Sequence, residues 1–377
     1  MKKYSILLCL TTFSFISLAC IWDEDTIEME RQRFPNTLEI ISGKFLRHSP
    51  EFYQWRIKDR EAKLKAIPKQ WNYYDDLAVA YDKIGNHAKA IELMLQKETL
   101  HPGQYETYAN LGTFYIHYKQ YQKGLQYIDK AIKINPNAHF GREVYQKYLV
   151  EYALTKVRNG KMPLPLDTLD FAEERNYYWF VKRKMKQKFD PKAAIKGVMG
   201  MIKFGNQDSP ILFEALGDLL EGEFLHESYD GTLLASLAYK KAATLVKSKN
   251  SKTRYLKRIS VSPYLNPKDD ININSLESTE YKLNQLYKDY LEQAQQLYQQ
   301  IRNDEVTWIK EGKNPEEEFA KKYYENSPDP TATFTIREKP VDKVAEKQTI
   351  SLSTLAIALG AGLLSFLVIF AISKKKS

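Results

Sequence analysis

The side chains that most often carry chemistry are few in this chain, and their spacing matches no known catalytic pattern. No glycine-rich phosphate loop, nucleophile elbow or His-Glu-x-x-His motif occurs in the 377 residues. Adjacent carboxylates such as Glu173 and Glu174 are typical of any solvated helix. The six histidines are scattered without ligand spacing: His48, His87, His101, His117, His139 and His226. The sequence therefore predicts a protein that is not an enzyme and that has no cofactor or metal ion.

Composition sets wide limits on the fold and on the partners. The length suits one large or two ordinary domains, and 43% hydrophobic residues can bury a sizeable core. The formal net charge is +9, which is modest for this length. We therefore expect solvated basic helix faces rather than nucleic-acid binding, including the stretches at 182–188 and 240–258.

The N-terminal residues predict export. Residues 1–3 are a short basic region, and residues 5–19 are apolar but too short to span a membrane comfortably. Ser17 and Ala19 place small side chains three and one before the next bond, which is the usual cleavage pattern. Residues 1–19 are therefore a predicted signal peptide.

Cleavage after Ala19 would leave Cys20 as the first residue. This placement resembles a bacterial lipoprotein, in which the cysteine thiol is acylated, although Leu18 stands one place later than in the usual pattern. The alternative is a plain signal peptide followed by an incidental cysteine. No cysteine follows Cys20, so the processed chain can form no internal disulfide.

The C-terminal residues predict a membrane anchor. Residues 352–372 are apolar over about 21 residues, which suits a bilayer core of about 30 Å. A basic tail at 374–377 follows and marks the cytoplasmic side. We therefore expect one transmembrane helix at 350–373, with the body on the extracytoplasmic, periplasmic side. Ala356 and Gly360 would also permit self-association of two such helices.

The organisation of the body follows from a repeat with a period of 34 residues. Small residues at Ala78 and Gly112 would let paired antiparallel helices approach closely, while Leu77 and Leu111 would fill the core. The residues that recur are Tyr74, Leu77, Tyr81 and Pro102, matched by Tyr108, Leu111, Tyr115 and Pro136. Such a period indicates helix–turn–helix units stacked in a solenoid.

These residues resemble the tetratricopeptide repeat family, in exported, membrane-anchored bacterial form. The match covers two repeats at 71–138, and it departs from the family at Lys97, where alanine is preferred. The resemblance implies an all-α solenoid whose first helices line a concave groove for peptides or helices. The implied groove residues are Asn72, Asp75, Val79, Asp82, Lys83, Glu106, Ala109, Thr113, Ile116 and His117. Their carboxylates favour a basic or mixed partner segment.

The segments before and after the two repeats also have patterns that predict their structure. Residues 20–70 predict a helical N-terminal segment, with a helix beginning at Ser49-Pro50-Glu51. Residues 139–246 predict divergent repeats of the same kind. Residues 247–325 predict a polar break followed by a long amphipathic helix that covers the solenoid or pairs with another chain. Residues 326–349, rich in proline and charge, predict a flexible linker.

The function expected from these features is a membrane-anchored extracytoplasmic scaffold that binds a protein or peptide partner in a cell-envelope complex. One alternative is a non-catalytic accessory subunit of an envelope enzyme or transporter. Another is a hydrolase with an unrecognised site, whose candidate residues would include Glu173, Glu174 and His226.

Overall fold

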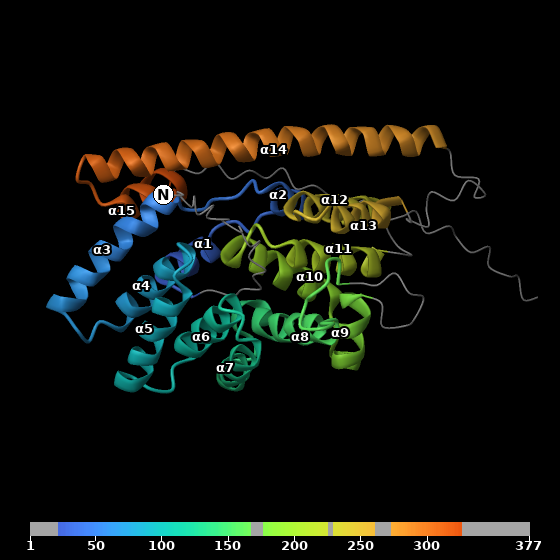
Figure 1. The fold of residues 1–377 in the computed structure, drawn as a ribbon. Coiled ribbons are helices and arrows are strands. Elements are labelled where there is room, and N and C mark those ends of the chain that lie inside the picture. The colour runs from blue at the N-terminus through green and yellow to red at the C-terminus, as the bar shows by residue number, and fades with distance from the viewer. Residues whose placement is uncertain (1–21, 167–175, 225–228, 261–272, 326–377) are drawn as a thin grey trace, which may run out of the picture. The chain divides into compact units, whose positions relative to one another are not determined.

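The chain is built from helices. The computed structural model describes residues 22–166, 176–224, 229–260 and 273–325, and every regular element longer than an isolated bridge in these ranges is a helix (Figure 1). The chain divides into two units, residues 1–337 and 338–377, and all described residues belong to the first. The all-α prediction is confirmed for this part of the chain.

The described helices include none that is both long and apolar enough to cross a membrane. The predicted transmembrane helix at 350–373, the linker at 326–349 and the signal peptide at 1–19 lie outside the described residues. Cys20, Glu173, Glu174 and His226 lie outside them too.

Three helices form the N-terminal segment, and each begins at a residue whose side chain caps it. Asp23 accepts a hydrogen bond from the backbone N–H of Thr26, and Ser49 accepts one from Phe52. Asn36 forms a reciprocal capping box. The helices are α1 (Glu24–Arg31), α2 (Thr37–Ser42) and α3 (Pro50–Ala66). The predicted helix start at Ser49-Pro50-Glu51 is confirmed.

The next four helices repeat with the predicted period. The helices of the first pair begin at Trp71 and His87, and those of the second pair begin 34 residues later, at Tyr105 and Tyr121. The helix ends recur with the same spacing. The helices are α4 (Trp71–Lys83), α5 (His87–Leu100), α6 (Tyr105–His117) and α7 (Tyr121–Ile134). Within each pair the two helices pack on each other (Figure 1).

Small residues allow this packing. A Cβ atom built on Gly112 would lie 2.6 Å from Cγ1 of Ile128, and one on Gly124 would lie 2.6 Å from Cγ1 of Ile116. The corresponding residues of the first pair, Ala78 and Ala90, are fully buried. The predicted close approach of the paired helices is therefore present.

The chain continues through six further α-helices. They are α8 (Arg142–Thr155), α9 (Tyr177–Met185), α10 (Pro191–Gly200), α11 (Pro210–Phe224), α12 (Tyr229–Leu245) and α13 (Lys249–Ser260), with short turns η1 (Ala138–Gly141), η2 (Lys186–Lys188) and η3 (Met201–Gly205). Helix α11 packs on α12, and the apolar residues buried on the two helices include Phe213, Leu216 and Leu220 of α11 and Ala235, Tyr239 and Ala242 of α12.

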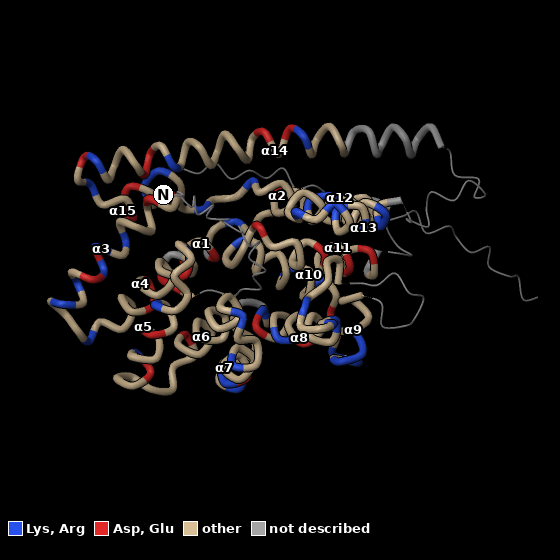
Figure 2. The backbone as a smooth tube through the Cα atoms, viewed as in Figure 1, with Lys and Arg blue, Asp and Glu red and all other residues tan. Residues whose placement is uncertain are grey.

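Residues 249–260 form helix α13, so the prediction of a polar break in this part of the chain is wrong. Its sequence is mostly polar, but Tyr255 is fully buried and Arg258 is buried against Asp218 of α11. Two inward-facing side chains three residues apart hold this helix against the body, although its composition resembles a loop. Lys and Arg mark α9 and α13 in Figure 2, but Arg258 is not part of a solvated face.

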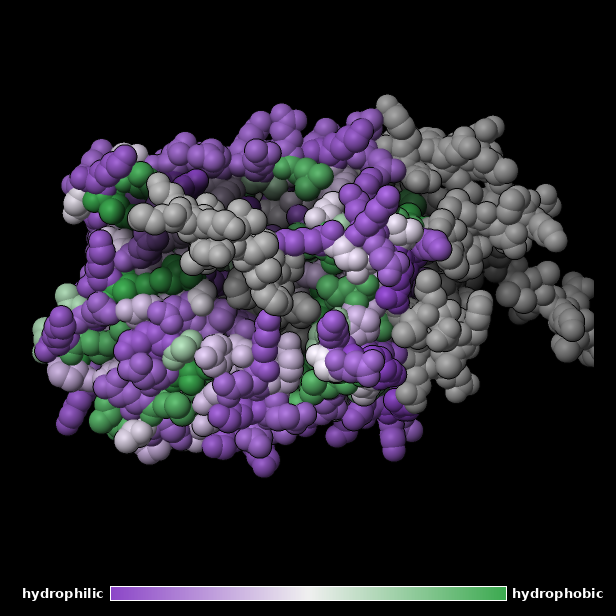
Figure 3. All heavy atoms as spheres, in the orientation of Figure 1, coloured by the Kyte–Doolittle hydropathy of each residue, from purple (hydrophilic) through white to green (hydrophobic). Residues whose placement is uncertain are grey.

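The long amphipathic helix is confirmed as α14 (Ile273–Lys310), followed by α15 (Pro315–Phe319) and η5 (Ala320–Glu325). Helix α14 packs against α2 and α3 (Figure 1). Its Glu305 is fully buried and accepts a hydrogen bond of 2.9 Å from the backbone N–H of Ser49. This helix therefore covers the N-terminal helices. On the face drawn in Figure 3, hydrophilic residues predominate and hydrophobic areas are small.

Candidate functional site

The ten predicted groove residues all lie on α4 and α6, but most are not open to solvent. Only Asn72 is exposed, and Lys83 and Glu106 are half-buried. Seven are buried: Asp75, Val79, Asp82, Ala109, Thr113, Ile116 and His117. Asp75, Asp82 and His117 therefore do not line the open groove that the resemblance implied.

The N-terminal segment of the same chain covers these helices. The backbone N–H of Trp22 donates to Oδ1 of Asn110 over 2.8 Å, and Nδ2 of Asn110 donates to the carbonyl oxygen of Trp22 over 2.8 Å. The backbone N–H of Glu24 donates to Asp76 over 3.3 Å. Asp23, between them, has extended backbone torsion angles. One amide side chain of α6 thus binds both polar backbone groups of Trp22.

Asn110 and Asp76 were not among the predicted residues. They occupy the same position in the two repeats, 34 residues apart on α6 and α4, and both contact the backbone of the N-terminal segment. Polar residues at one buried position of two consecutive repeats were the signal that could have identified them.

Buried ion pairs hold the same segment in place. Arg56 of α3 contacts Asp23 at 2.9 Å and Glu316 of α15 at 2.7 Å. Arg60, one turn later, contacts Asp76 at 2.8 Å and Glu316 at 2.7 Å. Burial raises the pKa of the Asp76 carboxyl in spite of these arginines. Residues 22–24 are therefore held by charged side chains from α3, α4 and α15.

The N-terminal segment contributes to the lining of two cavities. The first, of about 420 Å³, is lined by residues that include His48, Asp82, Lys83, His87, His117 and Lys203, and is called the His117 cavity. The second, of about 410 Å³, is lined by residues that include Trp22, Glu24, Glu28, Trp71, His101 and Glu106, and is called the Trp71 cavity. Asp23 lines both.

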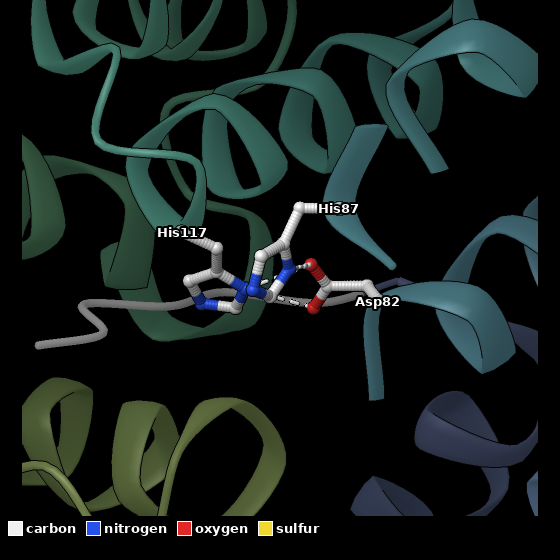
Figure 4. Close-up of side chains that lie close together, drawn as sticks. All are labelled: Asp82, His87 and His117. Carbon is white, nitrogen blue, oxygen red and sulfur yellow. Dashed lines mark hydrogen bonds and ion pairs between the residues drawn. The ribbon is translucent and has the colours of Figure 1, made fainter. Parts of the chain in front are cut away.

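Three polar side chains meet at the wall of the His117 cavity (Figure 4). Nδ1 of His87 lies 2.7 Å from Oδ1 of Asp82, and Nδ1 of His117 lies 2.8 Å from Oδ2 of the same carboxylate. Asp82 is fully enclosed, and burial alone would raise its pKa. Interactions with His117 and His87 outweigh that effect and hold the pKa of Asp82 well below its usual range. The carboxylate is therefore ionised at neutral pH.

The two ring nitrogens of His117, Nδ1 and Nε2, differ in their hydrogen bonding. His117 is only 7% exposed, and its Nε2 has no hydrogen-bond partner among the described residues. The residue lines the cavity. A buried imidazole nitrogen in the wall of a cavity is chemically suited to accept a proton or to bind a cation.

The Trp71 cavity is acidic. The described residues that line it carry five carboxylates and one lysine: Asp23, Glu24, Glu28, Asp75, Glu106 and Lys97. Nζ of Lys97 contacts Asp75 at 2.5 Å, so this lysine is paired with a buried carboxylate. Burial nevertheless raises the pKa of Asp75 to about 7. Trp71 stacks on His101 with ring centroids 4.9 Å apart. This cavity offers negative charge beside aromatic surface.

No protein-family model matches the chain, and no curated protein sequence matches it either. The likeness to tetratricopeptide repeats therefore stands on the residues quoted above and on the 34-residue spacing of helices α4 to α7.

Proposed function

We propose that the protein is a docking scaffold of the tetratricopeptide repeat type that binds an extended, basic segment of a partner at the Trp71 cavity. The observation that carries the proposal is the paired hydrogen bonding of Asn110 with Trp22, 2.8 Å in each direction. A side-chain amide that binds backbone N–H and C=O recognises extended chain whatever its sequence. The helices α4 and α6 thus already bind one extended segment, in cis.

The charge of the cavity selects the partner segment. Glu24, Glu106 and Trp71 line the same cavity, and Lys97 is paired with Asp75. A segment with lysine or arginine beside apolar residues would complement this surface. The interaction of exposed charges is screened by salt, so binding should weaken as ionic strength rises.

A binding measurement on the full chain tests the proposal. The probe is a fluorescent peptide of alternating lysine and valine, and the comparison peptide has glutamate in place of lysine. We expect only the lysine peptide to bind. The double variant Glu24→Lys, Glu106→Lys should weaken its binding by up to about 30-fold, because exposed pairs contribute about 0.2–1 kcal/mol each.

The matched control reverses charge elsewhere, in Lys182→Glu, Lys184→Glu on α9. It should leave peptide affinity unchanged. Equal binding of both peptides, or loss of binding in the α9 control but not in the Glu24 and Glu106 variant, would refute the proposal. Asp75 and Asp82 are unsuitable for this test because both are buried, so a lysine there would disturb folding.

We further propose that the scaffold works on the extracytoplasmic side of a membrane, anchored by residues 352–372. The full chain should stay with membranes through a carbonate wash, whereas a chain ending at Asn326 should be released. If Cys20 is acylated, the truncated chain should remain partly bound and Cys20→Ala should release it. Complete release of the truncated chain with Cys20 intact would exclude the lipid anchor. Release of the full chain by the wash would exclude the helical one.

A further inference from the structure

We propose that Asp82, His87 and His117 form a binding site for a transition-metal cation of the Zn²⁺ class, with an open coordination position toward the His117 cavity. Each residue supplies one ligand atom: a carboxylate oxygen of Asp82 and one ring nitrogen of each histidine. One carboxylate and two imidazoles are a common zinc ligand set. The site goes beyond peptide docking and does not depend on it.

The three side chains come from three helix ends. Asp82 lies one residue before the end of α4, His87 begins α5, and His117 ends α6. Their candidate ligand atoms all lie within 4.8 Å of one another. Packed helices therefore hold the set together, and loop residues supply none of the three ligands (Figure 4).

The distances fit a cation after a small adjustment. Zn²⁺ binds histidine nitrogen and carboxylate oxygen at about 2.0–2.2 Å, which places neighbouring ligands roughly 3.3 Å apart in a tetrahedron. The nitrogen–oxygen distances are 2.7 and 2.8 Å. A small rotation of each imidazole ring, which moves its nitrogen by a few tenths of an ångström, would open this space.

The charge also fits. The Asp82 carboxylate is buried and lies 2.7 and 2.8 Å from the Nδ1 atoms of His87 and His117. The lysines of the same cavity are held by backbone carbonyls: Nζ of Lys83 contacts the oxygens of Phe204 and Gly205 at 2.7 and 2.9 Å, and Lys203 contacts that of Met29. These lysines favour water, hydroxide or an anion as the fourth ligand.

Independent support comes from Nε2 of His117. This nitrogen is buried, belongs to a residue that lines the cavity, and has no hydrogen-bond partner among the described residues. An unsatisfied buried polar group is costly, so a nitrogen of this kind is a candidate ligand atom. Either ring nitrogen of His117 can bind a cation chemically, and Nδ1 lies 2.8 Å from Oδ2 of Asp82.

Cobalt titration of the full chain tests the site. The chain is first treated with a chelator, and Co²⁺ is then added as a spectroscopic probe for Zn²⁺. We expect visible absorption bands of low-symmetry, N/O-ligated Co²⁺ that saturate at one equivalent and are abolished by Zn²⁺. His87→Gln should lower the affinity at least about 100-fold, because even loss of residues that only support ligands costs 10–100-fold.

His101→Gln is the matched control, because it removes a histidine that lies in the Trp71 cavity. The Co²⁺ affinity of this variant should equal that of the unaltered chain. His87 is partly exposed, so His87→Gln should fold normally, which circular dichroism checks. Absence of saturable Co²⁺ binding in the unaltered chain would overturn the proposal. So would equal Co²⁺ affinity in His87→Gln and the unaltered chain, which would make the cluster a hydrogen-bonded helix contact only.

Discussion

Helix pairs α6/α7 and α11/α12 each pack closely at a glycine, but they bury different side chains there. In the first pair the crossing glycine, Gly112, faces the aliphatic side chain of Ile128. In the second pair Gly217 faces the ring of Tyr239, so closely that a Cβ atom would lie 2.4 Å from its Cε1. A glycine permits close packing in both pairs. Only in the second pair does the side chain that faces the glycine carry a polar group, the hydroxyl of Tyr239.

That polar group belongs to a closed network. The hydroxyl of Tyr239 donates to Asp218 over 2.9 Å, and Nη2 of Arg258 donates to the same carboxylate over 2.7 Å. Glu214, one turn earlier, accepts from the hydroxyl of Tyr255 over 2.7 Å. Each carboxylate has an arginine or tyrosine partner, so the network joins α11, α12 and α13 as structure.

The cluster at the end of α6 is built differently. Asp82 is buried like Asp218, but its partners are His87 and His117, and the group borders a cavity. Histidine can bind a cation or a proton, which arginine cannot. Burial of a carboxylate alone therefore does not indicate function. The identity of its partners and the presence of adjoining space distinguish the two clusters.

The largest expected effect comes from breaking the closed network. Arg258→Leu removes the guanidinium and leaves Glu214 and Asp218 buried without their cation. Removal of one partner of a buried ion pair costs about 3–5 kcal/mol, so urea unfolding should show a loss of that size. Lys257→Leu, at the exposed neighbouring position, should change stability little. A small loss in Arg258→Leu would mean that α13 does not depend on this contact.

The next effect concerns the crossings themselves. Gly112→Leu should destabilise the chain by about 1–3 kcal/mol, because the new side chain would clash with Ile128 at a site with no room. Thermal unfolding measures the loss. Lys123→Leu on the exposed face of α7 is the control. An unchanged melting temperature in Gly112→Leu would contradict the tight packing of α6 on α7.

Local pattern predicted much of this fold. The cap and proline at Ser49-Pro50-Glu51 predicted the start of α3, because capping depends on neighbouring residues only. The 34-residue recurrence predicted α4 to α7, and the amphipathic pattern within 247–325 predicted α14. Each of these signals lies within one helix or one repeat.

The candidate site could not be predicted in the same way, because its contacts are distant in sequence. Trp22 and Asn110 are 88 residues apart, and no periodicity links them. Asp82, His87 and His117 come together only because consecutive repeats bring their helix ends to one edge. For the same reason α13 resembled a loop: its inward-facing Arg258 is matched by Asp218, 40 residues earlier.

The closed network should also make stability depend on pH. Burial, with Asp218 nearby, raises the pKa of Glu214 to about 7 from its usual 4.5. The folded chain therefore keeps this proton when the unfolded chain has lost it, so the contribution is full below pH 4.5 and is lost as pH rises toward 7. Stability should fall over this range by up to about 1.4 kcal/mol per pH unit.

Glu214→Gln should reduce that slope, because the amide does not titrate yet can still accept from Tyr255. Urea unfolding at a series of pH values measures the slope. Glu92→Gln, on the exposed face of α5, makes the same chemical change and should leave the slope as it is. Identical slopes in Glu214→Gln and the unaltered chain would show that Glu214 does not titrate between pH 4.5 and 7.

The smallest expected effect lies at the other cluster and decides what that cluster is for. His87→Gln replaces one hydrogen-bond donor to Asp82 by another at a partly exposed position. The net contribution of one hydrogen bond is about 0.5–1.5 kcal/mol, and the glutamine amide can supply part of it. We therefore expect a loss below about 1 kcal/mol in urea unfolding of the metal-free chain, alongside the loss of Co²⁺ affinity. A loss of 3 kcal/mol or more would place Asp82 and its histidines with the Arg258 network, as a contact that the fold requires. A small loss with unchanged metal affinity would leave the cluster without either role.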